Sequence, residues 1–249
     1  MIHVCMVTLG GRDLVELAIA SLDKYAGDDV SLDIVDLPKD TTDPWAHGRA
    51  IDFWRQRQKI GIRDSDLVTL MDPDCVLLSH RWRIEVDRVF NDPHVGIWGA
   101  GASEDWGPRV HASMMVIRGK LFNNYEYSFM PQSLDSRWRD TGGNYSRLAS
   151  GAWKVIPVER GPDWNGVSAW WGTPIDQHAC SYNLQPIPLW SHLGGGSHSD
   201  PTRMTRWERV KRFRAIQQRE RFKQAVRFHL KDGILGGRLH DERTAWDHT

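Results

Sequence analysis

The chain has 249 residues, of which 40% are hydrophobic and 26% charged, and its formal net charge at pH 7 is zero. This composition excludes an intrinsically disordered chain, and no apolar run reaches the roughly 18 residues that a membrane helix needs. The N-terminal stretch MIHVCMVTLGG lacks a basic leader and a cleavage site, so we interpret it as a core strand and not as a signal peptide. Three widely spaced cysteines favour reduced thiols and a cytoplasmic location, which would be the host cytoplasm for a viral protein.

The charge is unevenly distributed along the chain. Residues 201–243 hold 13 Lys/Arg and 5 Asp/Glu, whereas residues 1–200 hold 19 basic and 26 acidic residues. A neutral total therefore combines an acidic body with a basic tail. We predict a catalytic domain over residues 1–200 and a basic helical C-terminal segment over residues 201–249.

The first part of the chain alternates between strand and helix patterns. Strands are predicted over residues 2–9, 31–38 and 66–71, and helices over residues 14–25 and 47–59. This alternation predicts an α/β domain with a largely parallel sheet.

The later part of the chain continues the alternation and then loses it. Its predicted elements are a helix over 80–90, strands over 94–101 and 109–119, a helix from 140 and a strand over 153–159. Residues 159–186 have no clear period and are interpreted as a long functional loop, in which Trp164, Trp170 and Trp171 either stack on a ligand or pack the loop. A short strand near residue 190 follows, and then a helical composition in which Met204, Trp207, Val210 and Phe213 form only a poor apolar stripe.

Two acidic residues, Asp72 and Asp74, directly follow the predicted strand over 66–71. Ligands of parallel sheets bind beyond the carboxyl ends of the strands, and alternation along an extended segment would aim both side chains to the same side. Two hard oxygen donors at that edge suit Mg²⁺ or Mn²⁺. The alternative is an Asp-Pro-Asp turn with solvated carboxylates.

The motifs occur in an order that resembles glycosyltransferases of the GT-A fold, including the large family-2-like group. The ordered set is Gly10-Gly11, VDLP, the pattern Gly48–Asp52, DSDLVTLMDPDC, HASMMVIRGKLF and RDTGGNYSRLASGAWKVIPV, and it covers about residues 1–195. The resemblance implies a Rossmann-like, mostly parallel sheet flanked by helices. Residues 1–100 would be the nucleotide-sugar-binding half, and residues 101–200 the acceptor half.

The resemblance also implies roles for individual residues. Asp74 would bind Mn²⁺ or Mg²⁺ directly, and Asp72 would contact the ribose or the metal through water. The metal would bridge the diphosphate of a UDP- or GDP-sugar and stabilise the departing nucleoside diphosphate. The residues that would hold the nucleotide sugar are Thr8, Gly10, Asp36, Arg49, Asp72 and His111.

His192 is the predicted third metal ligand, because many GT-A enzymes add a histidine from near the end of the catalytic domain. It follows a predicted strand and precedes three glycines, whose amides could approach phosphate oxygens. His198 is the alternative, and either histidine could instead be an ordinary loop residue.

Asp140 is the predicted general base, which an inverting transferase needs to deprotonate the acceptor hydroxyl. The family often has two adjacent acids here, whereas Arg139 precedes Asp140 in this chain. Asp140 could also be a helix N-cap, and Asp135 is an alternative base. Inverting and retaining mechanisms both stay open.

Two other functions fit parts of the sequence. DPDCV matches the nucleophile motif of haloacid-dehalogenase-type phosphohydrolases, but that motif normally ends the first core strand, and here two strands precede it. The basic tail fits a non-catalytic nucleic-acid-binding protein. A transferase with a basic tail could glycosylate a polyanionic acceptor, and a known case of that kind is sugar transfer to hydroxymethylated bases in bacteriophage DNA. We expect this acceptor, and the alternatives are a polysaccharide, a lipid-linked sugar, a protein or a small molecule.

Overall fold

The computed structural model describes most of the first 192 residues and part of a C-terminal helix. The described residues are 1–8, 12–38, 45–58, 61–104, 107–124, 126–130, 141–158, 176–182, 185–192, 219–220 and 222–231.

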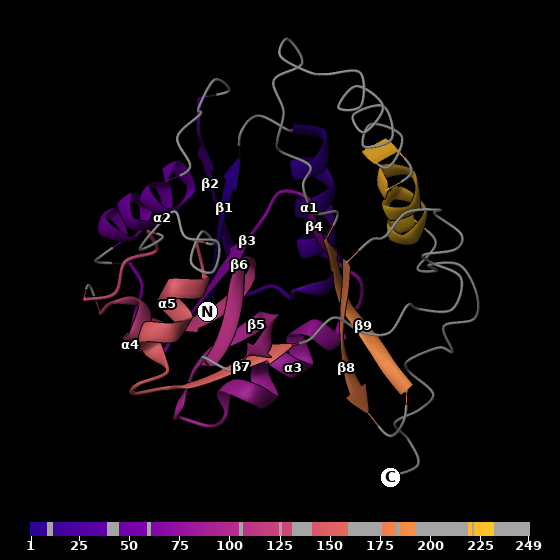
Figure 1. Ribbon diagram of the computed structural model, residues 1–249. Helices are drawn as coiled ribbons and strands as arrows, with labels where there is room; N and C mark the ends of the chain where they lie inside the picture. The colour runs from indigo at the N-terminus through magenta and orange to yellow at the C-terminus, as the bar shows by residue number, and fades with distance from the viewer. Residues whose placement is uncertain are drawn as a thin grey trace, which may run out of the picture.

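A six-stranded mixed sheet forms the centre of the molecule (Figure 1). Its strands lie in the order β2-β1-β3-β6-β5-β7. Only β6 runs antiparallel to its neighbours β3 and β5, so the predicted, largely parallel α/β sheet is confirmed. The bounds are β1 Ile2–Thr8, β2 Val30–Asp36, β3 Leu67–Met71, β5 Val95–Glu104, β6 Gly107–Arg118 and β7 Lys154–Val158.

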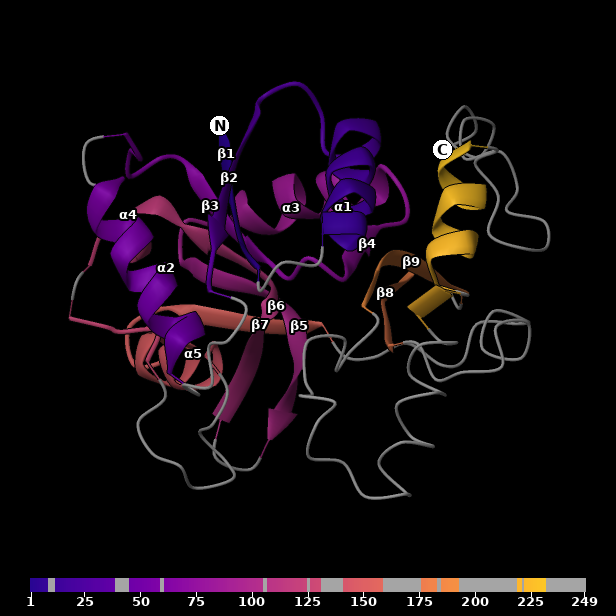
Figure 2. The ribbon, with the colours of Figure 1, turned by 90° about the horizontal axis from the view of Figure 1, so that it is seen from above.

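Helices cover both faces of this sheet and make a three-layer α/β/α arrangement (Figure 2). On one face lie α1 (Arg12–Tyr25) and α3 (Arg81–Phe90), which contribute to one hydrophobic core. On the other face lie α2 (Ala46–Arg57), α4 (Gly119–Phe122) and α5 (Gly143–Ala149), which contribute to a second core. The predicted strands and helices of the first 158 residues therefore form at the expected places.

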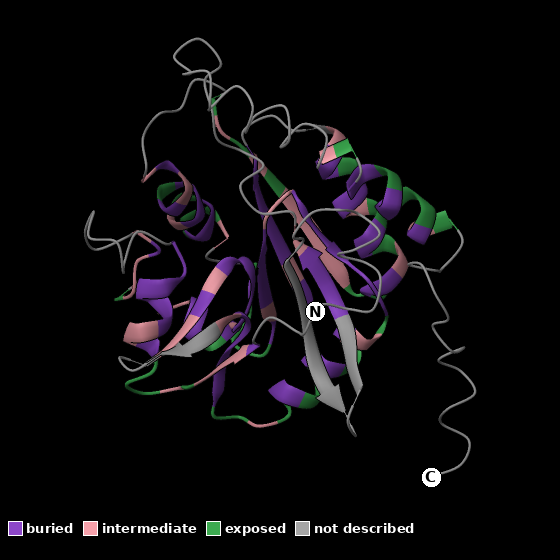
Figure 3. Ribbon diagram, turned by 45° about the vertical axis from the view of Figure 1, so that its right-hand side comes forward, coloured by how far each residue is buried: buried purple, intermediate pink, exposed green. Residues whose placement is uncertain are grey.

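Strand alternation explains how one sheet can serve two cores. In β1, Ile2, Val4 and Met6 belong to the core under α1 and α3, whereas Cys5 and Val7 belong to the core under α2. Figure 3 shows the central strands buried and the helices exposed on their outer sides. The sheet is thus apolar on both faces, so polar ligands are left with its edges.

A second sheet has three strands in the order β4-β9-β8, all antiparallel to their neighbours. The bounds are β4 Cys75–Leu77, β8 Asp176–Tyr182 and β9 Gln185–His192. The sequence prediction missed β4 because its three residues are paired with a strand more than 100 residues later. The prediction of an irregular segment over 159–186 is wrong for residues 176–182 and 185–186, which lie in β8 and β9, whereas Trp164, Trp170 and Trp171 lie outside the described residues.

The helical segment 222–231 packs against β4 and α1. It is the unlabelled yellow helix in Figures 1 and 2. The buried residues Phe222, Ala225, Val226 and His229 share one helical face, and Lys223 beside them is also buried. The predicted poor stripe concerned residues 204–213, which lie outside the described part of the chain. Among the described helices, none combines the length and the apolar character needed to cross a bilayer.

Candidate metal centre

Asp72 and Asp74 lie where the sequence predicts them, immediately after β3 at the carboxyl edge of the main sheet. The backbone N–H of Asp72 donates to the carbonyl of Ser113 on β6, at 3.0 Å. The N–H of Cys75 donates to the carbonyl of Asp72, also at 3.0 Å, and closes a turn around Pro73 and Asp74. The expectation that an extended segment aligns the two side chains is therefore wrong, because a turn brings them together.

The second sheet places His192 beside this turn. Cys75, the first residue of β4, is the register partner of His192, the last residue of β9. The Nε2 atom of His192 lies 3.2 Å from Oδ1 of Asp74 and 3.6 Å from Oδ2 of Asp72. Residues 118 positions apart in sequence thus meet because β9 pairs with the strand that Asp74 precedes.

The geometry of these three side chains fits a single divalent cation. One ligand atom from each of Asp72, Asp74 and His192 lies within 4.8 Å of the other two. Two ligands bound to one ion at about 2.1 Å are separated by at most about 4.2 Å. Both distances from His192 already meet that limit, so small rotations of the carboxylates would complete the set.

His47, in the first turn of α2, is a residue of this site that the sequence reasoning missed. Its Nε2 lies 3.8 Å from Oδ1 of Asp72, so this carboxylate lies between two imidazoles. On its other side, Nδ1 of His47 is 3.4 Å from Oγ1 of Thr141, which is buried. The available signal was the position of His47 just after the polar loop that leads into α2, on the ligand side of the sheet.

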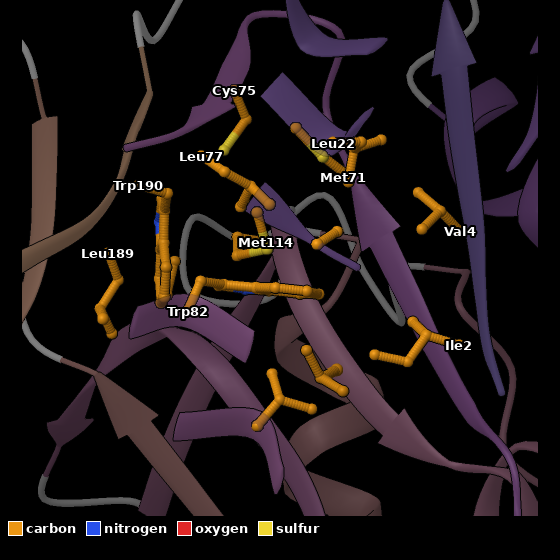
Figure 4. Close-up of a cluster of buried hydrophobic side chains, with 14 of the residues drawn as sticks. Ile2, Val4, Leu22, Met71, Cys75, Leu77, Trp82, Met114, Leu189 and Trp190 are labelled. Carbon is orange, nitrogen blue, oxygen red and sulfur yellow. The ribbon is translucent and has the colours of Figure 1, made fainter. Parts of the chain in front are cut away.

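Cys75 is adjacent to the site in sequence but belongs to the core. Its side chain is fully buried among apolar residues of β1, β3 and α1 (Figure 4). Burial, and then the charges of Asp74 and Asp72, raise the pKa of this thiol well above its usual value. The thiol therefore stays protonated and is unsuited to bind the cation.

The structure brings part of the predicted nucleotide-binding set together. Thr8 and Asp36 end the adjacent strands β1 and β2 and are register partners. Asp36 and Arg49 line one groove of about 900 Å³ between β2 and α2, together with the exposed ring of Phe53. His111 lies on β6, two residues before the Ser113 whose carbonyl holds Asp72.

The Gly48–Asp52 pattern has a local structural cause. A Cβ atom at Gly48 would lie 2.7 Å from the carbonyl oxygen of Phe129, so only glycine allows this contact. Asp52 accepts hydrogen bonds from the Ser128 hydroxyl at 2.5 Å and from the Phe129 N–H at 3.2 Å, and pairs with Arg55 at 2.9 Å. These contacts attach residues 126–130 to α2.

Some of the predicted residues lie outside the described part of the chain. They are Gly10, the general-base candidates Asp140 and Asp135, and His198. Their placement therefore stays a prediction.

No protein-family model matches the sequence, and no curated protein matches it. Among solved structures, the chain is similar to mannosyltransferase PcManGT from Pyrobaculum calidifontis, determined with GDP-Man and Mn²⁺, with 13% identity, a TM-score of 0.44, and coverage of 68% of this chain and 59% of that one. It is also similar to a glycosyltransferase involved in glycosylation of the major capsid of PBCV-1, with 11% identity, a TM-score of 0.34, and coverage of 47% of this chain and 59% of that one. A third similar structure is apo GlyE of Streptococcus pneumoniae TIGR4, with 12% identity, a TM-score of 0.39, and coverage of 90% of this chain and 64% of that one. The chain covers less than two-thirds of the length of each of these proteins.

Proposed function

We propose that this chain is a metal-dependent glycosyltransferase that moves a sugar from a nucleotide-sugar donor to a hydroxyl acceptor. The observation that carries the proposal is the convergence of Asp72, Asp74 and His192 at the carboxyl edge of a mostly parallel sheet. That edge is where α/β sheets bind nucleotides, and a divalent cation there commonly shares its shell with substrate phosphates.

Asp72, Asp74 and His192 would hold the ion. When bound, the divalent ion would supply Lewis-acid stabilisation of charge on a diphosphate leaving group. Carboxylates suit Mg²⁺ and Mn²⁺, whereas imidazole suits more polarisable ions, so the mixed donor set favours Mn²⁺. His47 would orient the Asp72 carboxylate through Oδ1, whereas His192 lies near Oδ2.

The remaining predicted residues would hold the donor and the acceptor. Thr8, Gly10 and Asp36 are proposed to contact the base and ribose, and Arg49 and His111 the rest of the nucleotide sugar. Asp36 and Arg49 share one groove, which supports a common ligand for them. Asp140 is proposed as the general base that removes the proton from the acceptor hydroxyl.

A thermal-shift screen of nucleoside diphosphates and nucleotide sugars, with and without Mn²⁺, tests the proposal. A ligand at 100 times its dissociation constant stabilises the protein by about 2.7 kcal/mol, which is a shift of roughly 5–10 °C for a chain of this size. We expect this shift only when nucleotide and metal are both present, and we expect Asp74→Ala to remove it together with donor turnover. Asp87→Ala, which removes an exposed carboxylate on α3, serves as the control and should behave like wild type.

A metal-independent shift, or an Asp74→Ala variant that keeps Mn²⁺-dependent nucleotide binding and turnover, would contradict the proposal. Hydrolysis of p-nitrophenyl phosphate would point instead to the phosphohydrolase alternative. The structure gives that alternative no added support, since β1 and β2 both precede the strand that carries the two aspartates.

For the acceptor, we propose a hydroxymethylated base in DNA. The support is the composition of residues 201–243, with 13 basic and 5 acidic residues. Of the basic residues on the described helix, Arg219 and Lys223 pair with Asp13, whereas Arg227 and Lys231 are exposed. The exposed pair is therefore the part of this helix suited to contact phosphates.

Fluorescence anisotropy with hydroxymethylated and unmodified duplexes tests this acceptor. We expect binding that weakens with salt, and an Arg227→Gln/Lys231→Gln variant whose log–log salt slope falls by about 2. Donor turnover should rise only with the hydroxymethylated duplex. Equal turnover with both duplexes, or with neither, would exclude this acceptor and leave the transferase proposal to the nucleotide screen.

A further inference from the structure

The C-terminal helix, residues 222–231 with Arg219 and Glu220 before them, is joined to the metal centre through β4. Its apolar face packs into a separate hydrophobic cluster with α1 and β4. The members of this cluster are Leu14, Leu17, Val76, Leu78, Phe222, Ala225 and Val226. Phe222 and Val226 are at most 1% exposed, so the docking is as tight as packing in the main core.

Polar contacts fix both ends of the helix against α1. Asp13, in the first turn of α1, pairs with Arg219 at 2.5 Å and with Lys223 at 2.8 Å. Burial raises the pKa of Asp13, but the hydrogen bonds from Lys223 and Arg219 outweigh it and lower the pKa to about 2. Near the other end, Nζ of Lys24 donates to the carbonyl of Leu230 at 2.7 Å. The two helices therefore lie side by side and run in the same direction.

His229 connects the helix to the end of β4. Its Nε2 lies 2.8 Å from the carbonyl oxygen of Leu78 and 2.9 Å from the hydroxyl of Tyr25 on α1. The side chain is almost fully buried, and burial lowers its pKa to about 4. His229 is therefore neutral at neutral pH and acts as an uncharged hydrogen-bonding link between three elements.

Strand β4 is held on both faces as a result. Val76 and Leu78 contact α1 and the C-terminal helix, whereas Cys75 and Leu77 face the main core (Figure 4). The N–H of Leu77 donates to the Ser21 hydroxyl of α1 at 3.0 Å. Asp74 is the residue immediately before this strand, so its position depends on how firmly the strand is held.

We propose that the C-terminal helix is a positioning element of the metal centre: by holding β4 against α1 and β9, it keeps Asp74 at the distance from His192 that a divalent cation requires. The proposal rests on the proposed metal-dependent function. It gives the basic C-terminal segment a role within the catalytic domain that the composition of the tail does not indicate.

Mn²⁺ binding to the full-length chain, measured by electron paramagnetic resonance of the free ion with no nucleotide present, tests this role. Val226→Asp places a charge in the buried face and should undock the helix. Gln224→Asp makes the same change of charge at an exposed position of the same helix and is the matched control. We expect about tenfold weaker Mn²⁺ binding for Val226→Asp, the effect usual for residues that orient metal ligands, and no change for Gln224→Asp.

Hydrogen exchange over residues 222–231 and circular dichroism establish that the helix is undocked while the domain stays folded. An undocked, folded Val226→Asp variant with wild-type Mn²⁺ affinity would overturn the proposal. If Val226→Asp fails to fold, His229→Asn and Tyr25→Phe decide: weaker Mn²⁺ binding in both supports the role, and wild-type affinity in both overturns it. If the wild-type chain binds no Mn²⁺ with or without nucleoside diphosphates, it is the proposed function that fails.

Discussion

A histidine–carboxylate cluster lies at each end of strand β3, and the two clusters differ in what the carboxylates contact. At the amino edge, His3 joins Ser31 and Asp66, with 2.9 Å between its Nδ1 and the Ser31 hydroxyl and 3.4 Å between its Nε2 and Oδ2 of Asp66. At the carboxyl edge, His192 joins Asp72 and Asp74. Burial does not explain the difference between the clusters, because one carboxylate in each, Asp66 and Asp74, has the same exposed fraction of 11%.

The two clusters do differ in how many carboxylates lie around one histidine. Asp66 is a single carboxylate that accepts from the backbone N–H of Arg63 at 2.9 Å as well as contacting His3. At the other edge, two carboxylates lie beside the Nε2 atom of His192, and His47 lies beside Asp72 as well. Like charges held together destabilise each other unless a cation offsets them. We therefore expect a structural role for the amino edge and a cation site at the carboxyl edge, although the residue types are the same.

Replacing each histidine by glutamine distinguishes the roles of the two clusters most directly. We expect His192→Gln to weaken Mn²⁺ binding by about 10- to 100-fold, because a ligand is lost, with little change in the stability of the metal-free protein. We expect His3→Gln to leave Mn²⁺ affinity unchanged and to lower the free energy of unfolding by about 0.5–1.5 kcal/mol, the usual contribution of one intramolecular hydrogen bond.

Calorimetric Mn²⁺ titration and urea unfolding of both variants measure the two quantities side by side. The comparison fails if His3→Gln weakens Mn²⁺ binding as much as His192→Gln does. It also fails if His192→Gln lowers the stability of the metal-free protein and leaves Mn²⁺ binding intact, because the cluster at the carboxyl edge would then be structural.

The part of the carboxyl-edge cluster that lies next to a strand in sequence could be predicted from the sequence. Asp72 and Asp74 follow an apolar strand, and that position alone places them at the ligand edge. His192 could be placed near them only through a resemblance, because the β4–β9 pairing that delivers it depends on contacts distant in sequence. His47 was missed for the same reason, since its contact with Asp72 depends on how α2 packs on the sheet.

The fold shows the same division between local and distant causes. The strands and helices of residues 1–158 could be predicted because the spacing of apolar residues within each element shows which face is buried. The strands β4 and β8 could not be predicted in this way. Strand β4 has only three residues, and among the described strands β8 pairs solely with β9. The docking of residues 222–231 was missed because the apolar stripe was sought further upstream.

Lowering the pH should also affect the two clusters differently, with a smaller change than the histidine substitutions cause. Burial raises the pKa of Asp66, but the Arg63 N–H and the His3 imidazole outweigh it, so the pKa lies below its usual value. A depressed carboxyl pKa stabilises the fold above the unfolded value near about 3.9, and this stability is lost as the pH falls through the lower folded value. We therefore expect Asp66→Asn to lower the free energy of unfolding by about 1 kcal/mol at pH 7. The difference in this free energy between the variant and wild type should become smaller toward pH 3.

Urea unfolding in EDTA between pH 3 and pH 7 measures this difference without a contribution from bound metal. Asp64→Asn removes an exposed carboxylate two residues away and is the matched control, for which we expect no such trend. A difference that stays constant with pH would show that the Asp66 charge is not what stabilises the amino edge. The carboxyl edge should respond to acid differently, through Mn²⁺ affinity, because protons compete with the cation for Asp72, Asp74 and His192. A lone carboxylate that accepts from protein donors thus adds to the stability of the fold, whereas two carboxylates held close together gain most from an ion.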